Sequence, residues 1–141
     1  MCALFDADNI GLPRIERIYI AIMATASRQS TYLFHFLKVE FMNDERYFYD
    51  ERYKKWLDNG YDSVPQKFKD LSILNEKMAA RPWDVTAEDI AKLTTNINEW
   101  WRDSDLMYAI IIMAWFHSLS GLCFGIGINP ETDAKFGHTV G

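Results

Sequence analysis

The sequence predicts an all-α protein, and three observations support that prediction. Apolar residues recur at spacings of three and four along several stretches, which is the period of a helix buried on one side. Proline or capping residues precede these stretches, as they do at helix starts. No stretch alternates apolar and polar residues like a half-buried strand. We therefore expect a single domain of about six helices with short connections.

Composition limits the classes of function. The 141 residues are about the length of one domain, and 49% of them are hydrophobic. The formal net charge of -5 and the scattered Lys and Arg argue against nucleic-acid binding, which needs clustered basic residues. Cys2 and Cys123 lie far apart without a CxxC motif, which indicates a reducing compartment and no disulfide framework or zinc knuckle. The N-terminus does not have the pattern of a secretory signal.

The first two helices are expected on either side of Ser27 to Ser30. Pro13 suits a first helical position, because a proline has no N–H that would need a partner there. The apolar residues that follow it at helical spacing are Ile15, Ile18, Tyr19, Ile22, Met23 and Ala26. Ser30 can cap the second helix with its side-chain oxygen. The apolar stripe of that helix consists of Leu33, Phe34, Leu37 and Phe41.

A third helix is expected between Asp44, as its cap, and Asn59-Gly60, as its end. Its predicted apolar face consists of Tyr49, Tyr53, Trp56 and Leu57. The aromatic run of this region includes Tyr47, Phe48, Tyr49, Tyr53 and Trp56. At helical spacing such a run is interpreted as core, and a partner-binding surface is the alternative.

The fourth helix begins near Pro65 and carries Phe68, Leu71, Leu74 or Asn75, and Met78. It is predicted to end at Arg81-Pro82-Trp83, because proline disfavours helical geometry in the residue before it. Thr86 to Asp89 has the pattern of a capping box, which indicates a short fifth helix bearing Ile90 and Leu93.

The last helix is predicted to start at Asp103 or Ser104 and contains the uncharged stretch 106–128. That stretch is about long enough to cross a bilayer. The central His117 and the acidic flanks with few basic anchors favour a buried helix of a soluble protein. A single-span membrane protein is the alternative.

Ser30 is the first candidate for chemistry, because the start of a helix stabilises a negative charge. A cysteine there would have a lowered pKa and become a reactive thiolate. The hydroxyl of Ser30 would instead need an adjacent base, and it cannot pass through a sulfenic acid. His35 follows five residues later and is not on the same helical face.

The remaining polar candidates are interpreted as structural residues. His35, between two phenylalanines, is expected to be a hydrogen-bonded histidine of the core or its boundary. Tyr32 is interpreted as a packed aromatic, with proton donation as the alternative. His117 precedes Ser118, but neighbouring helical residues do not face each other, so a satisfied buried histidine is expected. No set of Asp, Glu and His residues has metal-ligand spacing, and no pattern indicates a cofactor.

Three segments resemble the amino-terminal domain of the sestrin family, in the same order. They are YIAIMATASRQSTYL (Tyr19–Leu33), KMAARPWDVTAEDIAKL (Lys77–Leu93) and HSLSGLCFGIGINPE (His117–Glu131). The resemblance covers about 12–131, although this chain is several residues longer between Phe41 and Trp56. It implies an all-α fold similar to the alkyl-hydroperoxidase AhpD family. We expect that helical domain at 13–128, with tails at 1–12 and 129–141.

The resemblance also implies a site. In sestrins a Cys-x-Tyr motif followed by a histidine is credited with hydroperoxide reduction. The matching positions here are Ser30, Tyr32 and Leu37, so only the tyrosine is retained. We therefore expect a degenerate, non-catalytic site. The alternative is an active hydroperoxide reductase that uses Cys123 as a displaced thiol.

The partners implied by the resemblance are proteins. Sestrins are associated with limiting reactive oxygen species and with restraining the target-of-rapamycin complex through GATOR proteins, in the cytoplasm and nucleus. Leucine binding is attributed chiefly to a carboxy-terminal domain beyond the position of Glu131, and it is not expected here. A lone half of a two-domain family would expose apolar surface, which predicts a possible homodimer. Whether the chain is a fragment, a truncated gene model or a stand-alone descendant stays open.

Overall fold

The computed structural model of the protein describes residues 12–27, 30–95 and 101–125, without the side chains of residues 61 and 123–125. This part of the chain forms seven α-helices and two short 3-10 helices, with no strand. The all-α prediction is therefore confirmed. The predicted C-terminal tail and all but Leu12 of the predicted N-terminal tail lie outside the described residues, and Leu12 itself is buried.

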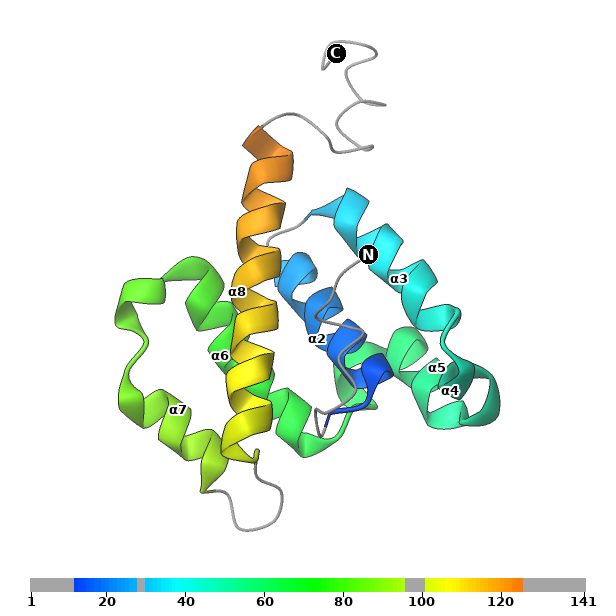
Figure 1. The fold of residues 1–141 in the computed structure, drawn as a ribbon, viewed down its shortest axis with the longest axis horizontal. Helices are drawn as coiled ribbons and strands as arrows, with labels where there is room; N and C mark the ends of the chain where they lie inside the picture. Colours follow the sequence, from blue (N-terminus) through cyan, green and yellow to red (C-terminus); the bar gives the residue numbers. More distant parts are fainter. Residues whose placement is uncertain (1–11, 28–29, 96–100, 126–141) are drawn as a thin grey trace.

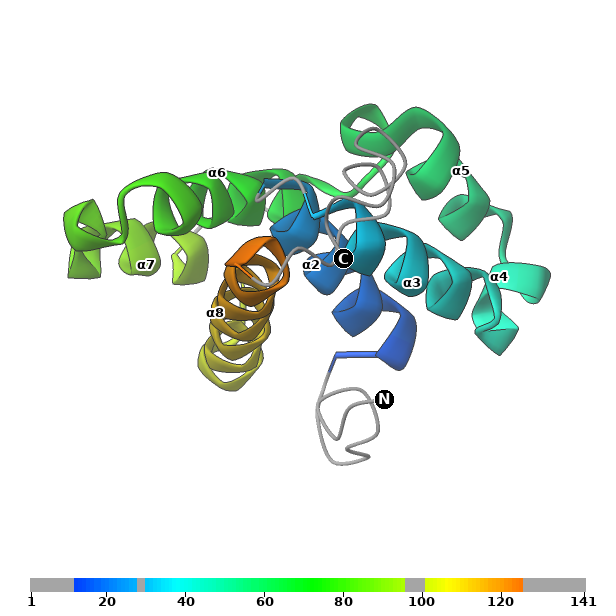
Figure 2. The same cartoon turned by 90° about the horizontal axis from the view of Figure 1, so that it is seen from above.

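Helix α2 (Arg14–Ser27) lies at the centre of the fold. Figures 1 and 2 show α3 (Thr31–Met42) on one side of it and α8 (Asp103–Gly125) on the other. Helix α6 (Gln66–Ala80) contacts both α2 and α8. Helices α4 (Glu45–Tyr49) and α5 (Glu51–Asn59) extend from the end of α3, and α7 (Ala87–Thr94) lies against α6. The 3-10 helices η1 (Gly60–Asp62) and η2 (Pro82–Asp84) precede α6 and α7.

The central position of α2 explains why it is buried on more than one side. The predicted face is buried at Ile15, Ile18, Tyr19 and Ile22. Arg17, Ile20, Ala21, Ala24 and Thr25 are buried as well, because α3, α6 and α8 all pack on this helix. Ala26, which was predicted on the apolar face, is exposed. Helix α2 is therefore a core helix that is buried on several faces, whereas the sequence predicted one apolar face.

The predicted third helix is wrong in one respect, because two helices occupy its range. Asp50 has extended backbone angles, φ -130° and ψ 109°, and its carboxylate accepts a hydrogen bond from the Arg52 backbone N–H at 3.0 Å. A second cap inside the range thus ends α4 and starts α5. Tyr49 then faces solvent and Phe48 is exposed, whereas Tyr53 and Trp56 are buried as predicted.

The predicted boundaries of the later helices are confirmed. Helix α6 begins directly after Pro65 and ends before Arg81-Pro82. At the start of α7, Thr86 and Asp89 form the predicted capping box. Helix α8 begins at Asp103. These boundaries were predictable because each depends on residues next to it in the sequence.

An aromatic cluster joins α2, α5, α6 and the residue that precedes α8 by two positions. The Trp56 ring lies 4.8 Å from that of Tyr53, 5.1 Å from Tyr19 and 5.3 Å from Phe68, centre to centre. The Phe68 ring continues to Trp101 at 5.4 Å, and the Trp101 indole N–H donates to the Lys67 carbonyl at 3.0 Å. Burial raises the pKa of Tyr19 to about 12, so its phenol stays neutral in the core.

We expect the substitution Trp56→Ala to lower the free energy of unfolding by about 3–5 kcal/mol, because it leaves a cavity in this cluster. Urea denaturation followed by circular dichroism measures the change. Trp83→Ala is the matched control, since Trp83 is 76% exposed, and a surface substitution changes stability by about 0.5 kcal/mol or less. Equal effects of the two substitutions would contradict this description of the core.

Candidate functional site

Ser30 lies at the corner where α3 begins, and its backbone holds that corner. Its N–H donates to the Thr25 carbonyl at 3.1 Å, and its carbonyl accepts from the Phe34 N–H at 3.0 Å. The predicted capping position is confirmed, but the hydroxyl makes no capping hydrogen bond. Ser30 is 3% exposed, so the hydroxyl is directed into the protein. The backbone of Ser30, and not its side chain, starts α3.

The three positions that we expected to match the sestrin motif differ in exposure. Ser30 and Leu37 are seven residues apart, which is two helical turns, so they share a face, and both are buried. Tyr32 is 44% exposed, which contradicts its interpretation as a packed aromatic. The face that carries Ser30 therefore presents the fully buried side chain of Leu37, at the position where the resemblance predicted the counterpart of the family histidine.

The two described histidines have different environments. His35 is exposed, with its ring against that of Phe34 at 5.8 Å between centres, so the prediction of a core or boundary histidine is wrong. His117 is buried, and its Nε2 lies 2.8 Å from Oδ1 of Asn75. The prediction of a satisfied buried histidine is confirmed for His117.

Asn75 of α6 connects α8 to the end of α2. Its side-chain nitrogen donates to the Met23 carbonyl at 3.1 Å and to the Ser27 hydroxyl at 2.6 Å, while its oxygen faces His117. The Met23 carbonyl can only accept, so the amide nitrogen must point towards α2. The amide oxygen then accepts from His117, which places a hydrogen on Nε2. That nitrogen is a donor in this arrangement and is not available as a base.

Asn75, His117, Ser27 and the Met23 carbonyl join α2, α6 and α8, and we call this group the polar junction. The Thr25 hydroxyl donates to the Ile22 carbonyl at 3.0 Å, and the hydroxyl of the buried Ser120 has no hydrogen-bond partner among the described residues. The Asn75 contribution was hard to find from the sequence, where a polar residue in an apolar stripe was the only signal. Nε2 of His117 is engaged with Asn75, and His35 is exposed.

The side chains of Cys2 and Cys123 lie outside the described residues, so the displaced-thiol alternative is not tested by the structure. Among the described residues, no group of three or more His, Cys, Asp or Glu residues is arranged to hold a metal ion.

Helix α8 has two apolar faces with different exposure. One face is buried, at Leu106, Ala109, Ile112, Met113, Phe116 and His117. The other face is exposed, at Met107 (65%), Ile111 (46%), Trp115 (53%) and Leu122 (57%), and its small exposed residues are Ala114 and Ser118. The prediction of a buried helix is therefore right for one side only. Below, "the α8 face" means these six exposed residues.

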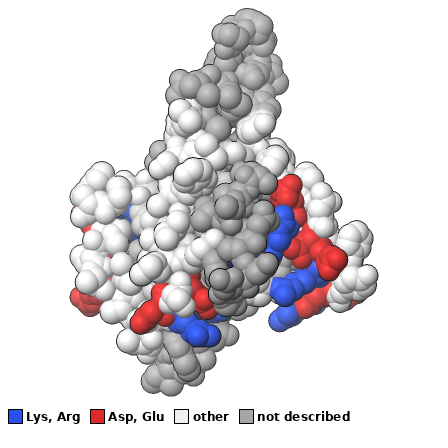
Figure 3. Space-filling view, in the orientation of Figure 1, with Lys and Arg blue, Asp and Glu red and all other residues white. Residues whose placement is uncertain are grey.

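The α8 face carries no formal charge from 107 to 122. Figure 3 shows an uncharged surface over α8 beyond its first turn, while acidic and basic side chains gather over the α3–α5 side of the molecule. Among the described helices, α8 is the one long and apolar enough to cross a membrane, with 39% of its most apolar window buried in the protein. Length and composition are weak evidence for a span, because core helices meet the same test. An exposed apolar face of this size is typical of a contact surface.

We expect Asn75→Leu to lower the free energy of unfolding by about 1–3 kcal/mol, because it leaves the buried partners of Asn75 unsatisfied. The effect is measured by urea denaturation. A double-mutant cycle with His117→Leu should give a coupling energy of at least about 0.5 kcal/mol. Asn59→Leu, at an exposed position, is the control. Additive effects of the Asn75 and His117 substitutions would argue against the bond between them.

Comparisons with known proteins agree on one family. The family model described as PA26 p53-induced protein (sestrin) matches residues 3–141. Sestrin-3 of Mus musculus is 38% identical over 122 residues, 86% of this chain and 23% of that protein. Sestrin-1 of Xenopus laevis is 39% identical over 86% of this chain and 24% of its own length. Sestrin-2 of Homo sapiens is 37% identical over 84% of this chain and 23% of its own length. The chain thus spans about a quarter of the curated relatives that it matches.

Proposed function

The chain belongs to the sestrin family, and from this premise we propose that it is a sestrin-type regulatory domain that acts through protein contacts and not through peroxidase chemistry. The observation that carries the proposal is the combination of a packed helical core with Ser30 and Leu37 at the two reactive positions of the family motif. A hydroxyl cannot pass through the thiol-to-sulfenic acid cycle, and a leucine side chain cannot move a proton.

The cellular role is proposed from family membership. The domain would belong to the response to reactive oxygen species and would restrain target-of-rapamycin signalling, with GATOR-type regulators as partners in the cytoplasm or nucleus. The matched relatives are about four times longer than this chain, so the proposal concerns only what this part contributes. It includes neither leucine binding nor a cofactor.

We expect the purified chain to show no catalytic consumption of an organic hydroperoxide, because the Ser30 oxygen cannot cycle electrons. Consumption over many turnovers, with a reducing partner and a heat-killed control, is the measurement. Sustained turnover would refute the non-catalytic proposal. If that turnover disappeared in the variant Cys123→Ser, the displaced-thiol alternative would replace the non-catalytic proposal.

The reverse substitution is the control for this assay. Ser30→Cys with Leu37→His introduces the thiol and the imidazole of the family motif together. Because Leu37 is fully buried, circular dichroism must first show that the double variant keeps its helical content. A folded double variant that turns over hydroperoxide shows that the assay detects a working site on this scaffold.

The α8 face is the proposed surface for protein contacts, and we propose that a second copy of the chain covers it in the isolated protein. Two copies can meet there without bringing like charges together, since the face has none. A pair would bury on the order of 1,000 Å², which is near the lower limit for a specific interface. Ala114 and Ser118 allow the two helices to approach closely near the middle of the face.

We expect the chain to have the mass of a dimer at micromolar concentration in light scattering, and Trp115→Glu to shift it to a monomer. A charge in an apolar interface remains unpaired when the interface forms, so it opposes association. Val39→Glu is the matched control, because Val39 is 51% exposed on α3, outside the α8 face. A monomeric unsubstituted chain would refute the dimer, and a chain that partitions only into membranes would support the spanning alternative.

A further inference from the structure

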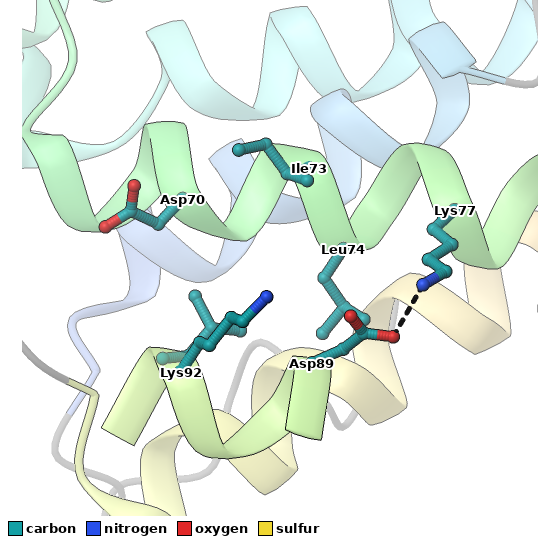
Figure 4. A pocket seen from close by; sticks show the side chains of 7 residues that line it. Asp70, Ile73, Leu74, Lys77, Asp89 and Lys92 are labelled. Carbon is teal, nitrogen blue, oxygen red and sulfur yellow. Dashed lines mark hydrogen bonds and ion pairs between the residues drawn. The ribbon is translucent and has the colours of Figure 1, made fainter. Parts of the chain in front are cut away.

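A pocket of about 330 Å³ lies between α6 and α7, away from the Ser30 corner and the α8 face. Its walls come from two short stretches at helical spacing, Asp70 to Lys77 on α6 and Asp89 to Leu93 on α7. Figure 4 shows these side chains on the two neighbouring helices, with Lys77 and Asp89 pointing towards each other. The volume is at the lower end of the range for ligand pockets, about 300–1,000 Å³, which suits one amino-acid side chain with its backbone better than a large cofactor.

One end of the pocket is closed by an ion pair. The Lys77 ammonium donates to the Asp89 carboxylate at 2.8 Å, and the same carboxylate oxygen accepts from the Thr86 backbone N–H at 2.9 Å. These bonds hold the pKa of Asp89 down at about 2, so the carboxylate stays charged. Because Asp89 also belongs to the capping box of α7, this end is fixed by the fold.

The other end of the pocket is bordered by Lys92 of α7 and Asp70 of α6. Lys92 lies one turn after Asp89, and Figure 4 shows its side chain reaching from α7 towards α6. In the part of the chain that the structure describes, Lys92 makes no ion pair. Asp70 of α6 accepts a hydrogen bond from Gln66 at 2.9 Å, and a carboxylate has lone pairs for further donors. A donor and an acceptor therefore border the open end from opposite helices.

The surface between these two groups is apolar. Leu74 and Leu93 are almost fully buried and form the floor, whereas Ile73 is 64% exposed and forms a wall. The formal charges of the lining residues cancel, because Asp70 and Asp89 balance Lys77 and Lys92. A ligand with a net charge would leave one charge unbalanced among these residues, so a neutral group with both a donor and an acceptor fits best.

We propose that the α6–α7 pocket binds a peptide group and its apolar side chain from an extended segment of a partner protein. The partner's N–H donates to Asp70, its carbonyl accepts from Lys92, and its side chain lies on Leu74 and Leu93. This inference rests on the proposed role in protein contacts, and it adds a second contact surface of stated chemistry. Because it concerns α6 and α7, it can fail while the non-catalytic role and the α8 face stand.

The test uses three small probes with the same phenyl group and different charges. N-acetyl-phenylalanine amide supplies a neutral peptide group, 3-phenylpropanoate an anion and 2-phenylethylammonium a cation. Binding to the purified chain is followed by NMR at the labelled methyl groups of Ile73, Leu74 and Leu93. We expect the amide to shift these methyl signals at millimolar concentration and to bind more tightly than either ion.

Two pocket variants and one control make the test specific. Lys92→Met and Asp70→Ala should each weaken binding of the amide about fivefold or more, because each removes a charged hydrogen-bonding group. Lys55→Met makes the same chemical change as Lys92→Met on the exposed side of α5 and should leave binding unchanged. The proposal is overturned if the pocket methyl signals do not move up to the solubility limit, if Lys92→Met binds as the unsubstituted chain does, or if the anion binds more tightly than the amide.

Discussion

The burial of α2 is the constraint on which the rest of the structure depends. Three helices, α3, α6 and α8, pack on this one helix of 14 residues, so its side chains set where each of them lies. Ile15, Ile18 and Ile20 are fully buried. A core helix of this kind leaves little freedom for its neighbours, because protein interiors are close-packed. The Ser30 corner, the polar junction and the α8 face all take their positions from contacts with α2.

A packed core does not explain why the end of α2 is polar. Asn75 and His117 satisfy each other and the Met23 carbonyl in a region where an unpaired polar group would be destabilising. Such a network fixes the relative position of α2, α6 and α8 more specifically than apolar contacts do, because hydrogen bonds depend on direction. The same network engages Nε2 of His117 as a hydrogen-bond donor to Asn75.

Signals from neighbouring residues made most helix boundaries predictable. The features that the sequence did not predict depend on packing between helices. Pro65, the Arg81-Pro82 step and the Thr86 capping box act on adjacent residues, so the sequence alone located these boundaries. Asp50 was missed because a cap in the middle of a helical pattern competes with continuation of the helix, and packing decides between them. The exposure of Trp115 was equally hidden, since α8 is apolar on both sides and no period shows which side the core covers.

The candidate site was only half predictable for the same reason. The sequence shows a serine at position 30 and a leucine at position 37, whereas the exposure of Tyr32 and the burial of Ser30 depend on the rotation of α3 against α2. Because Ser30 and Leu37 share the buried face of α3, packing now acts on both positions. A polar or ionisable group at position 37 would have to be buried, at a free-energy cost that leucine avoids. A leucine at position 37 therefore suits the core.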